Sequence, residues 1–86
     1  MKKDSKRIQF TVRRILKYEY RPFYDRYERE VYRALLLLSD TNGNVYEWLT
    51  GCEVREGAIV SATPLYTYGG GITRITQGRI RGYAEI

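Results

Sequence analysis

The sequence predicts a single all-β domain folded as a small closed barrel of five strands. Three observations favour this fold class. Long stretches alternate apolar with polar residues at the period of two that half-buried strands show. Turn-forming residues separate these stretches, most clearly at Asn42-Gly43, a strong short-range hairpin signal. The chain has 86 residues, which leaves room for one thin core, because such a chain buries roughly 60% of its unfolded surface.

The first predicted strand covers residues 8–20. Ile8 and Phe10 share one face of this strand, whereas Ile15 lies in the opposite phase. A change of phase within one strand is typical of a bulge or a sharp coil. We therefore expect an irregularity near residues 13–15.

The second and third strands are predicted as a hairpin. The apolar segment 30–38 runs into the turn at 39–44, and the alternating segment 45–50 follows it. Residues 19–29, which mix charges, aromatic rings and a proline, are expected to form a loop before this hairpin. Because segment 30–38 is apolar on both faces, one face is expected to line the barrel. The other would be covered by a protein partner or a second copy of the chain.

The last two strands are predicted at residues 58–68 and 72–81. Pro64 has no N–H group to donate, so it requires an edge, a bulge or an end of its strand. Gly69–Gly71 is expected to be a flexible hairpin tip, and Gly78 is expected to mark a bend. Closing these strands into a barrel would remove exposed sheet edges.

This order of signals resembles the OB-fold of single-stranded DNA-binding proteins of the replication protein A type. The resemblance spans about residues 8–82 and implies a small five-stranded Greek-key OB-fold barrel. The connector at 51–57 leaves room for little or no helix between strands 3 and 4, which many OB-folds carry. The matching positions are Leu35–Leu38, Asp40, Gly43, Val45–Leu49, Glu56-Gly57, Ala58–Tyr68, Gly69–Gly71 and Ile72–Ile75.

The resemblance also implies where a ligand would bind: across strands 2 and 3, between the first loop and the last hairpin. Aromatic and arginine side chains gather there, as single strands require, because unpaired bases stack on rings and guanidinium groups neutralise phosphates. The predicted nucleic-acid-binding residues are Arg21, Phe23, Tyr24, Arg26, Tyr27, Tyr32, Arg33, Tyr46, Trp48, Tyr66, Tyr68, Arg74 and Arg79.

The orientation of Trp48 is left open by the alternation. Tyr46 and Trp48 lie in one phase of their strand, and Val45 and Leu49 lie in the other. If Val45 and Leu49 face the core, the aromatic pair forms an exposed platform. Glu47, however, shares the phase of Val45 and Leu49, so the arrangement with Trp48 in the core is equally compatible.

Charge and composition narrow the function classes. The net charge is +5, with basic stretches near both ends, and a basic domain favours polyanions. Residues 1–7 are expected to form a flexible basic arm ahead of the domain at 8–86. With no histidine and the single Cys52 in an acidic connector, neither a catalytic site nor a metal or other cofactor is expected. No apolar run approaches the ~20 residues of a membrane span, so a soluble, cytoplasmic protein without a membrane partner is expected.

The predicted function is sequence-tolerant binding of single-stranded DNA, in replication, recombination or mobile-element maintenance. Two alternatives stay open. RNA is one, because nothing in the sequence distinguishes a ribose hydroxyl. The other is a protein-interaction module, such as a subunit, an inhibitor or a phage accessory factor, since tyrosine and arginine also dominate protein interfaces.

Overall fold

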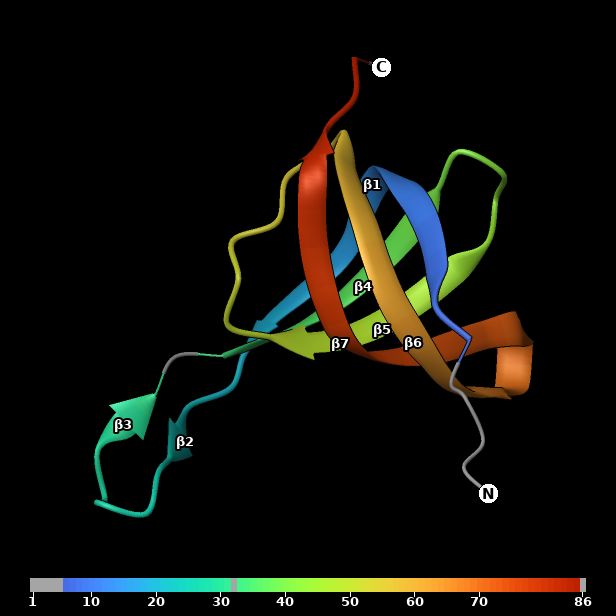
Figure 1. The fold of residues 1–86 in the computed structure, drawn as a ribbon. Coiled ribbons are helices and arrows are strands. Elements are labelled where there is room, and N and C mark those ends of the chain that lie inside the picture. Colours follow the sequence, from blue (N-terminus) through green and yellow to red (C-terminus); the bar gives the residue numbers. More distant parts are fainter. Residues whose placement is uncertain (1–5, 32, 86) are drawn as a thin grey trace.

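A computed structural model describes residues 6–31 and 33–85. Five strands form a closed barrel in the order β1-β4-β5-β7-β6 (Figure 1). The neighbours pair antiparallel except β5 and β7, which pair parallel. The predicted all-β, five-stranded fold is therefore confirmed, and the architecture is consistent with an OB-fold-like barrel. The strands are β1 (Ile8–Tyr20), β4 (Ala34–Asp40), β5 (Val45–Thr50), β6 (Ala58–Tyr68) and β7 (Ile72–Tyr83).

Strand β1 closes the barrel by pairing with two different neighbours. Its first half pairs with β6, and its second half pairs with β4. Against β4, the register shifts between Val12 and Arg14 and again between Ile15 and Lys17. The irregularity predicted near residues 13–15 is thus present, and the added twist lets one strand serve both neighbours.

The hairpin of β4 and β5 turns where Asn42-Gly43 predicts it. Gly43 has a φ of 88° and donates its N–H to the carbonyl oxygen of Asp40 at 3.2 Å. The buried carboxylate of Asp40 accepts the backbone N–H groups of Asn42 and Asn44, at 2.9 and 2.8 Å. It also accepts the hydroxyl of Tyr46 at 3.3 Å, which joins the turn to the core.

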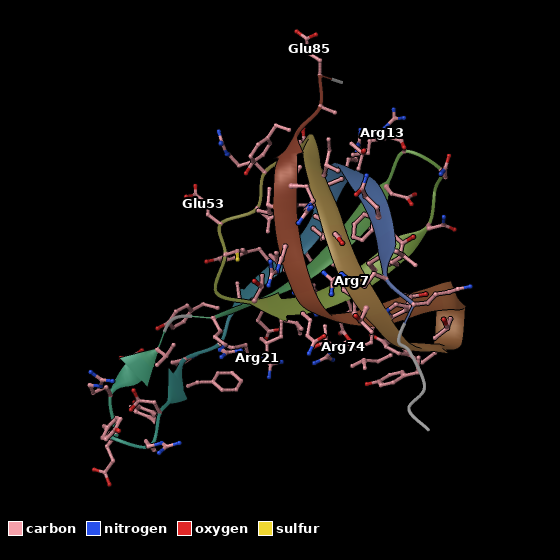
Figure 2. All side chains as sticks on the ribbon, in the orientation of Figure 1. Arg7, Arg13, Arg21, Glu53, Arg74 and Glu85 are labelled. Atoms are coloured by element: carbon pink, nitrogen blue, oxygen red, sulfur yellow. The ribbon has the colours of Figure 1, made fainter. Side chains whose placement is uncertain are left out.

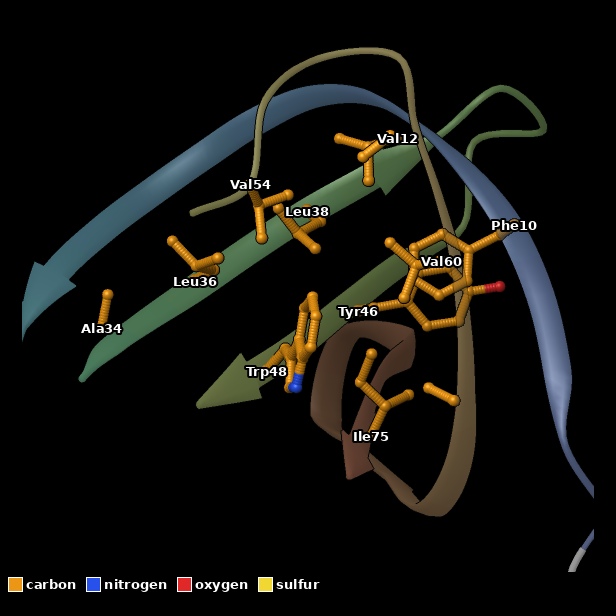
Figure 3. Close-up of a cluster of buried hydrophobic side chains, with 12 residues drawn as sticks. Phe10, Val12, Ala34, Leu36, Leu38, Tyr46, Trp48, Val54, Val60 and Ile75 are labelled. Carbon is orange, nitrogen blue, oxygen red and sulfur yellow. The ribbon is translucent and has the colours of Figure 1, made fainter. Parts of the chain in front are cut away.

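Alternation along β4 and β5 sorts their side chains between the core and the outer surface. Leu36 and Leu38 point inward, and Tyr46 stacks on Phe10 with ring centroids 4.0 Å apart. Figure 3 shows these side chains around the indole of Trp48. The buried hydrophobic cluster comprises Phe10, Val12, Ala34, Leu36, Leu38, Tyr46, Trp48, Val54, Ala58, Val60, Ala62 and Ile75.

A bulge in β7 makes room for Trp48. The register of β6 and β7 shifts between Ser61 and Thr63, and Gln77 adopts a φ of 54°. The next residue, Gly78, lies so close to Trp48 that a Cβ atom there would overlap the indole ring. The bend expected at Gly78 coincides with this bulge. A glycine is required there because the indole leaves no room for a Cβ atom.

Two segments were predicted to be irregular, a loop and a flexible arm. The predicted loop at 19–29 contains part of a short two-stranded hairpin, β2 (Phe23–Tyr24) with β3 (Glu30–Val31), which projects from the barrel (Figure 1). At the end of the segment 1–7 that was predicted to be a flexible arm, Arg7 forms hydrogen bonds to β6 and β7. Residues 1–5 lie outside the described part of the chain.

The end of the barrel near the connector at 51–57 is closed by a side chain instead of a helix. Val54 is buried in the core cluster. Gly57 has a φ of 92° and donates its N–H to the carbonyl oxygen of Val12 at 2.7 Å. Among the described residues, helical geometry occurs only in the 3-10 turn η1 (Gly69–Gly71), at the tip predicted to be glycine-rich.

Candidate nucleic-acid interface

One outer face of the barrel has the position that a ligand would take in an OB-fold. It consists of the outward phase of β4 and β5 and is half-buried, not fully exposed. Across the two strands Leu35 pairs with Leu49, and Leu37 pairs with Glu47. We call Leu35, Leu37, Val45, Glu47 and Leu49 the β4–β5 face.

Two hairpins bound the β4–β5 face at opposite ends of β5. Ala34, which follows the β2–β3 hairpin, pairs with Thr50 at the end of β5. Ile72, which follows the tip of the β6–β7 hairpin, pairs with Val45 at its beginning. In Figure 1 both hairpins project beyond the lower end of the barrel, on opposite sides of it. We call them the first arm (residues 21–31 and 33) and the second arm (65–74).

The first arm presents exposed rings and arginines. Tyr24 and Tyr27 are 70% and 68% exposed, respectively, and the guanidinium of Arg33 lies 5.3 Å from the ring centroid of Phe23. The Nε atom of Arg33 has no hydrogen-bond partner among the described residues. That Nε atom is buried, and stacking on the ring holds the planar guanidinium group in one orientation.

A carboxylate at the tip shapes the first arm. Asp25 accepts the backbone N–H groups of Tyr27 and Arg29, at 2.9 and 3.0 Å. It also forms an ion pair with the Arg29 guanidinium at 3.0 Å. The backbone hydrogen bond from Arg29, followed by those from Tyr27 and the Arg29 side chain, holds the pKa of Asp25 below its ordinary value.

The second arm covers one end of the β4–β5 face with tyrosines. The ring centroids of Tyr66 and Tyr68 lie 6.1 Å apart, with the planes tilted by 44°. Tyr68 lines a hollow of about 160 Å³ together with Leu37, Glu47 and Ile72. A hydrogen bond to Glu47 raises the pKa of the Tyr68 hydroxyl.

Three cations near the face, Lys17, Arg21 and Arg74, each lie beside a carboxylate. Arg74 Nη1 lies 2.8 Å from Glu47 Oε1. Lys17 and Arg21 share Glu19, at 3.9 and 3.3 Å. Figure 2 shows Arg21 and Arg74 along the lower side of the barrel, between the two arms. The two pairs with Glu19 are solvent-exposed and contribute little stability, so a phosphate can replace that carboxylate at small cost, whereas the Arg74–Glu47 pair is partly buried.

The structure brings together most of the predicted site residues on the two arms. Four of the thirteen predicted residues are not among those grouped on the arms. Tyr46 and Trp48 are 9% and 2% exposed, so they are core residues, and the predicted platform is corrected. Arg79 lies with Arg7 and Arg81 beside another hollow, away from the face. Tyr32 lies outside the described residues. The grouped residues are Arg21, Phe23, Tyr24, Arg26, Tyr27, Arg33, Tyr66, Tyr68 and Arg74.

Sequence reasoning missed the aliphatic and charged residues of the sheet itself. Leu35, Leu37 and Lys17 line the hollow under Tyr68, and Glu47 anchors Arg74. The position of Glu47 in the alternation was the available signal. A carboxylate is costly to bury, so the residues that share its phase in the strand are expected on the outer side of the barrel. That signal would have placed Trp48 in the core.

Comparisons with protein-family models, with curated proteins and with solved structures found no match. None of the helical geometry in residues 6–31 and 33–85 is long and apolar enough to cross a membrane. Over the same residues, no three side chains of the metal-binding types gather into a site.

Proposed function

We propose that this protein binds single-stranded nucleic acid across the β4–β5 face, with DNA as the ligand. The observation that carries the proposal is the pair of arms, each bearing exposed aromatic rings, at opposite ends of one sheet face. Tyr66 and Tyr68 would stack bases at one end, and Phe23, Tyr24 and Tyr27 at the other. Stacking on rings tolerates any base, so the binding would depend little on sequence.

Phosphate contacts would come from arginines at the ends of the arms that join the barrel. Arg21 and Arg74 already lie beside carboxylates, Arg21 in an exposed pair and Arg74 in a partly buried one. Bases on the leucines of the face would add apolar contact and exclude water. The two acidic residues, Glu19 and Glu47, would hold the cations in position until a phosphate arrives.

The second arm provides a direct test of this proposal. The variants Tyr66→Ala and Tyr68→Ala should each weaken binding of an oligothymidylate by about 5- to 150-fold, because a base stacked on a ring contributes about 1–3 kcal/mol. Tyr83→Ala is the matched control, since Tyr83 is also exposed but packs against Arg55 outside the arms. Equal affinities of the three variants in fluorescence anisotropy would refute the proposal. The same titration with oligouridylate separates DNA from RNA.

A specific observation favours a second candidate function, association with another copy of this chain. The β4–β5 face is lined largely by aliphatic side chains, and Leu35, Leu37 and Leu49 form a contiguous patch. An aliphatic surface suits a protein partner at least as well as a base. Sedimentation equilibrium should then show a dimer that Leu37→Glu disrupts; a monomer at all concentrations would exclude this candidate.

A further inference from the structure

A second group of arginines lies on the outer wall of β6 and β7, apart from the β4–β5 face. Arg7, Arg79 and Arg81 line a hollow of about 280 Å³. Arg79 pairs with Ser61 across the two strands, and Arg81 follows two residues later on the same face. The three side chains come from opposite ends of the sequence, and only the closed barrel brings them together.

Arg7, which lines this hollow, is anchored by four hydrogen bonds. Its Nη2 donates to the carbonyl oxygens of Ser61 and Gln77, at 2.8 and 2.9 Å. Its Nε and Nη1 donate to the hydroxyls of Ser61 and Thr63, at 3.1 and 3.3 Å. These bonds reach the bulge at which β6 and β7 shift register, so Arg7 satisfies backbone carbonyls that the bulge leaves free.

Arg79 and Arg81 are exposed, and neither forms an ion pair with a carboxylate in residues 6–31 and 33–85. Among the described residues, the ion pairs of this protein involve Glu19, Asp25 and Glu47, none of which pairs with either arginine. Three like charges in one hollow repel one another unless an anion is present. The arrangement therefore differs from that of Lys17, Arg21 and Arg74 near the β4–β5 face, each of which pairs with a carboxylate.

We propose that Arg7, Arg79 and Arg81 form a phosphate-binding site separate from the β4–β5 face. Arg79 and Arg81 supply mobile, bidentate guanidinium groups for phosphate oxygens, and the anchored Arg7 supplies a fixed positive charge. For the source of the phosphate, the inference rests on the proposed function. A nucleic-acid strand long enough to extend beyond the β4–β5 face would bring its backbone phosphates to this site. Arg74 and Arg79 are five residues apart on β7, at most about 16 Å at about 3.3 Å per residue.

Inorganic tripolyphosphate provides a test that needs no nucleic acid. In ¹⁵N-resolved NMR spectra it should shift the amides of Ser61, Arg79 and Arg81, and the shifts should disappear in the double variant Arg79→Ala/Arg81→Ala. The matched control is Arg13→Ala/Arg14→Ala, which removes the same charge from two exposed arginines near the β1 bulge. Shifts that persist in the first variant, or that vanish equally in both, would overturn the site.

Strand length separates this site from the proposed function. For a 20-mer of dT, the slope of log affinity against log salt should fall by about 1.4 in the Arg79/Arg81 variant, because two phosphate contacts are lost at about 0.7 each. A 6-mer bound by the face should be unaffected. If the 20-mer binds and its slope is the same in both variants, the site is refuted and the proposed function stands. If no oligonucleotide binds but tripolyphosphate shifts the site amides, the site stands with a free polyphosphate as its ligand.

Discussion

At the scale of single residues, the contact between Gly78 and Trp48 determines how the core closes. The indole lies against bare backbone, and a Cβ atom at Gly78 would overlap the ring. We predict that Gly78→Ala lowers the free energy of unfolding by about 1–3 kcal/mol, the usual cost of overpacking. Gly82→Ala is the control, because no atom lies within 4 Å of its added Cβ. Urea denaturation measures both variants, and equal stabilities would contradict the packing described for Trp48.

Asp40 is the second residue whose effect can be isolated. Its buried carboxylate accepts four hydrogen bonds, from Asn42, from two groups of Asn44, and from the Tyr46 hydroxyl. Asp40→Ala would leave these donors unpaired and should lower the free energy of unfolding by about 1–3 kcal/mol.

The same variant has a spectroscopic consequence. Burial first, and then the charge and hydrogen bond of Asp40, raise the pKa of Tyr46. A group with a raised pKa stabilises the fold below its unfolded value of 10.0 and loses that effect as the pH rises through the folded value. Asp40→Ala should therefore lower the pKa of the buried tyrosine in an ultraviolet titration. An unchanged titration would show that Asp40 does not act on Tyr46.

At the scale of elements, the first arm depends on a single carboxylate. Hydrogen bonds from Arg29 and Tyr27 lower the pKa of Asp25, so its contribution is present above the unfolded value of 3.8 and is lost as the pH falls through the lower, folded value. We predict that the amides of Tyr27 and Arg29 change together below pH 3.8 in NMR spectra, while those of the second arm stay constant. A midpoint at or above 3.8 would contradict the capped turn.

The elements also show what the sequence can and cannot predict. The β1 bulge, the Asn42-Gly43 turn and the strand containing Pro64 depend on local chemistry, and they were predictable. Alternation alone left the orientation of Trp48 open because it defines two phases, although the cost of burying Glu47 in the other phase favours the inward orientation of Trp48 that the structure has. The β2–β3 hairpin escaped prediction because its two-residue strands carry too little periodicity. The anchoring of Arg7 depends on partners more than 50 residues away.

At the scale of the whole molecule, one closed barrel presents two surfaces of different character. The β4–β5 face consists of aliphatic residues and Glu47, with the tyrosines of the two arms and three ion-paired cations around it. The wall around Arg79 carries arginines that form no ion pair among the described residues. With a net charge of +5, the protein is expected to attract polyanions over a distance, and under the proposed function the arms would make a flexible single strand bind better than a duplex.

Affinity for single-stranded against double-stranded DNA tests this account most directly. Fluorescence anisotropy with a labelled 20-mer of dT, and with a duplex of the same length, is measured over a series of salt concentrations. We predict saturable binding of the single strand at low salt, a steep decrease as salt rises, and clearly weaker binding of the duplex, whose bases cannot reach the tyrosines. Absence of binding at low salt, or equal affinity for both forms, would contradict the account.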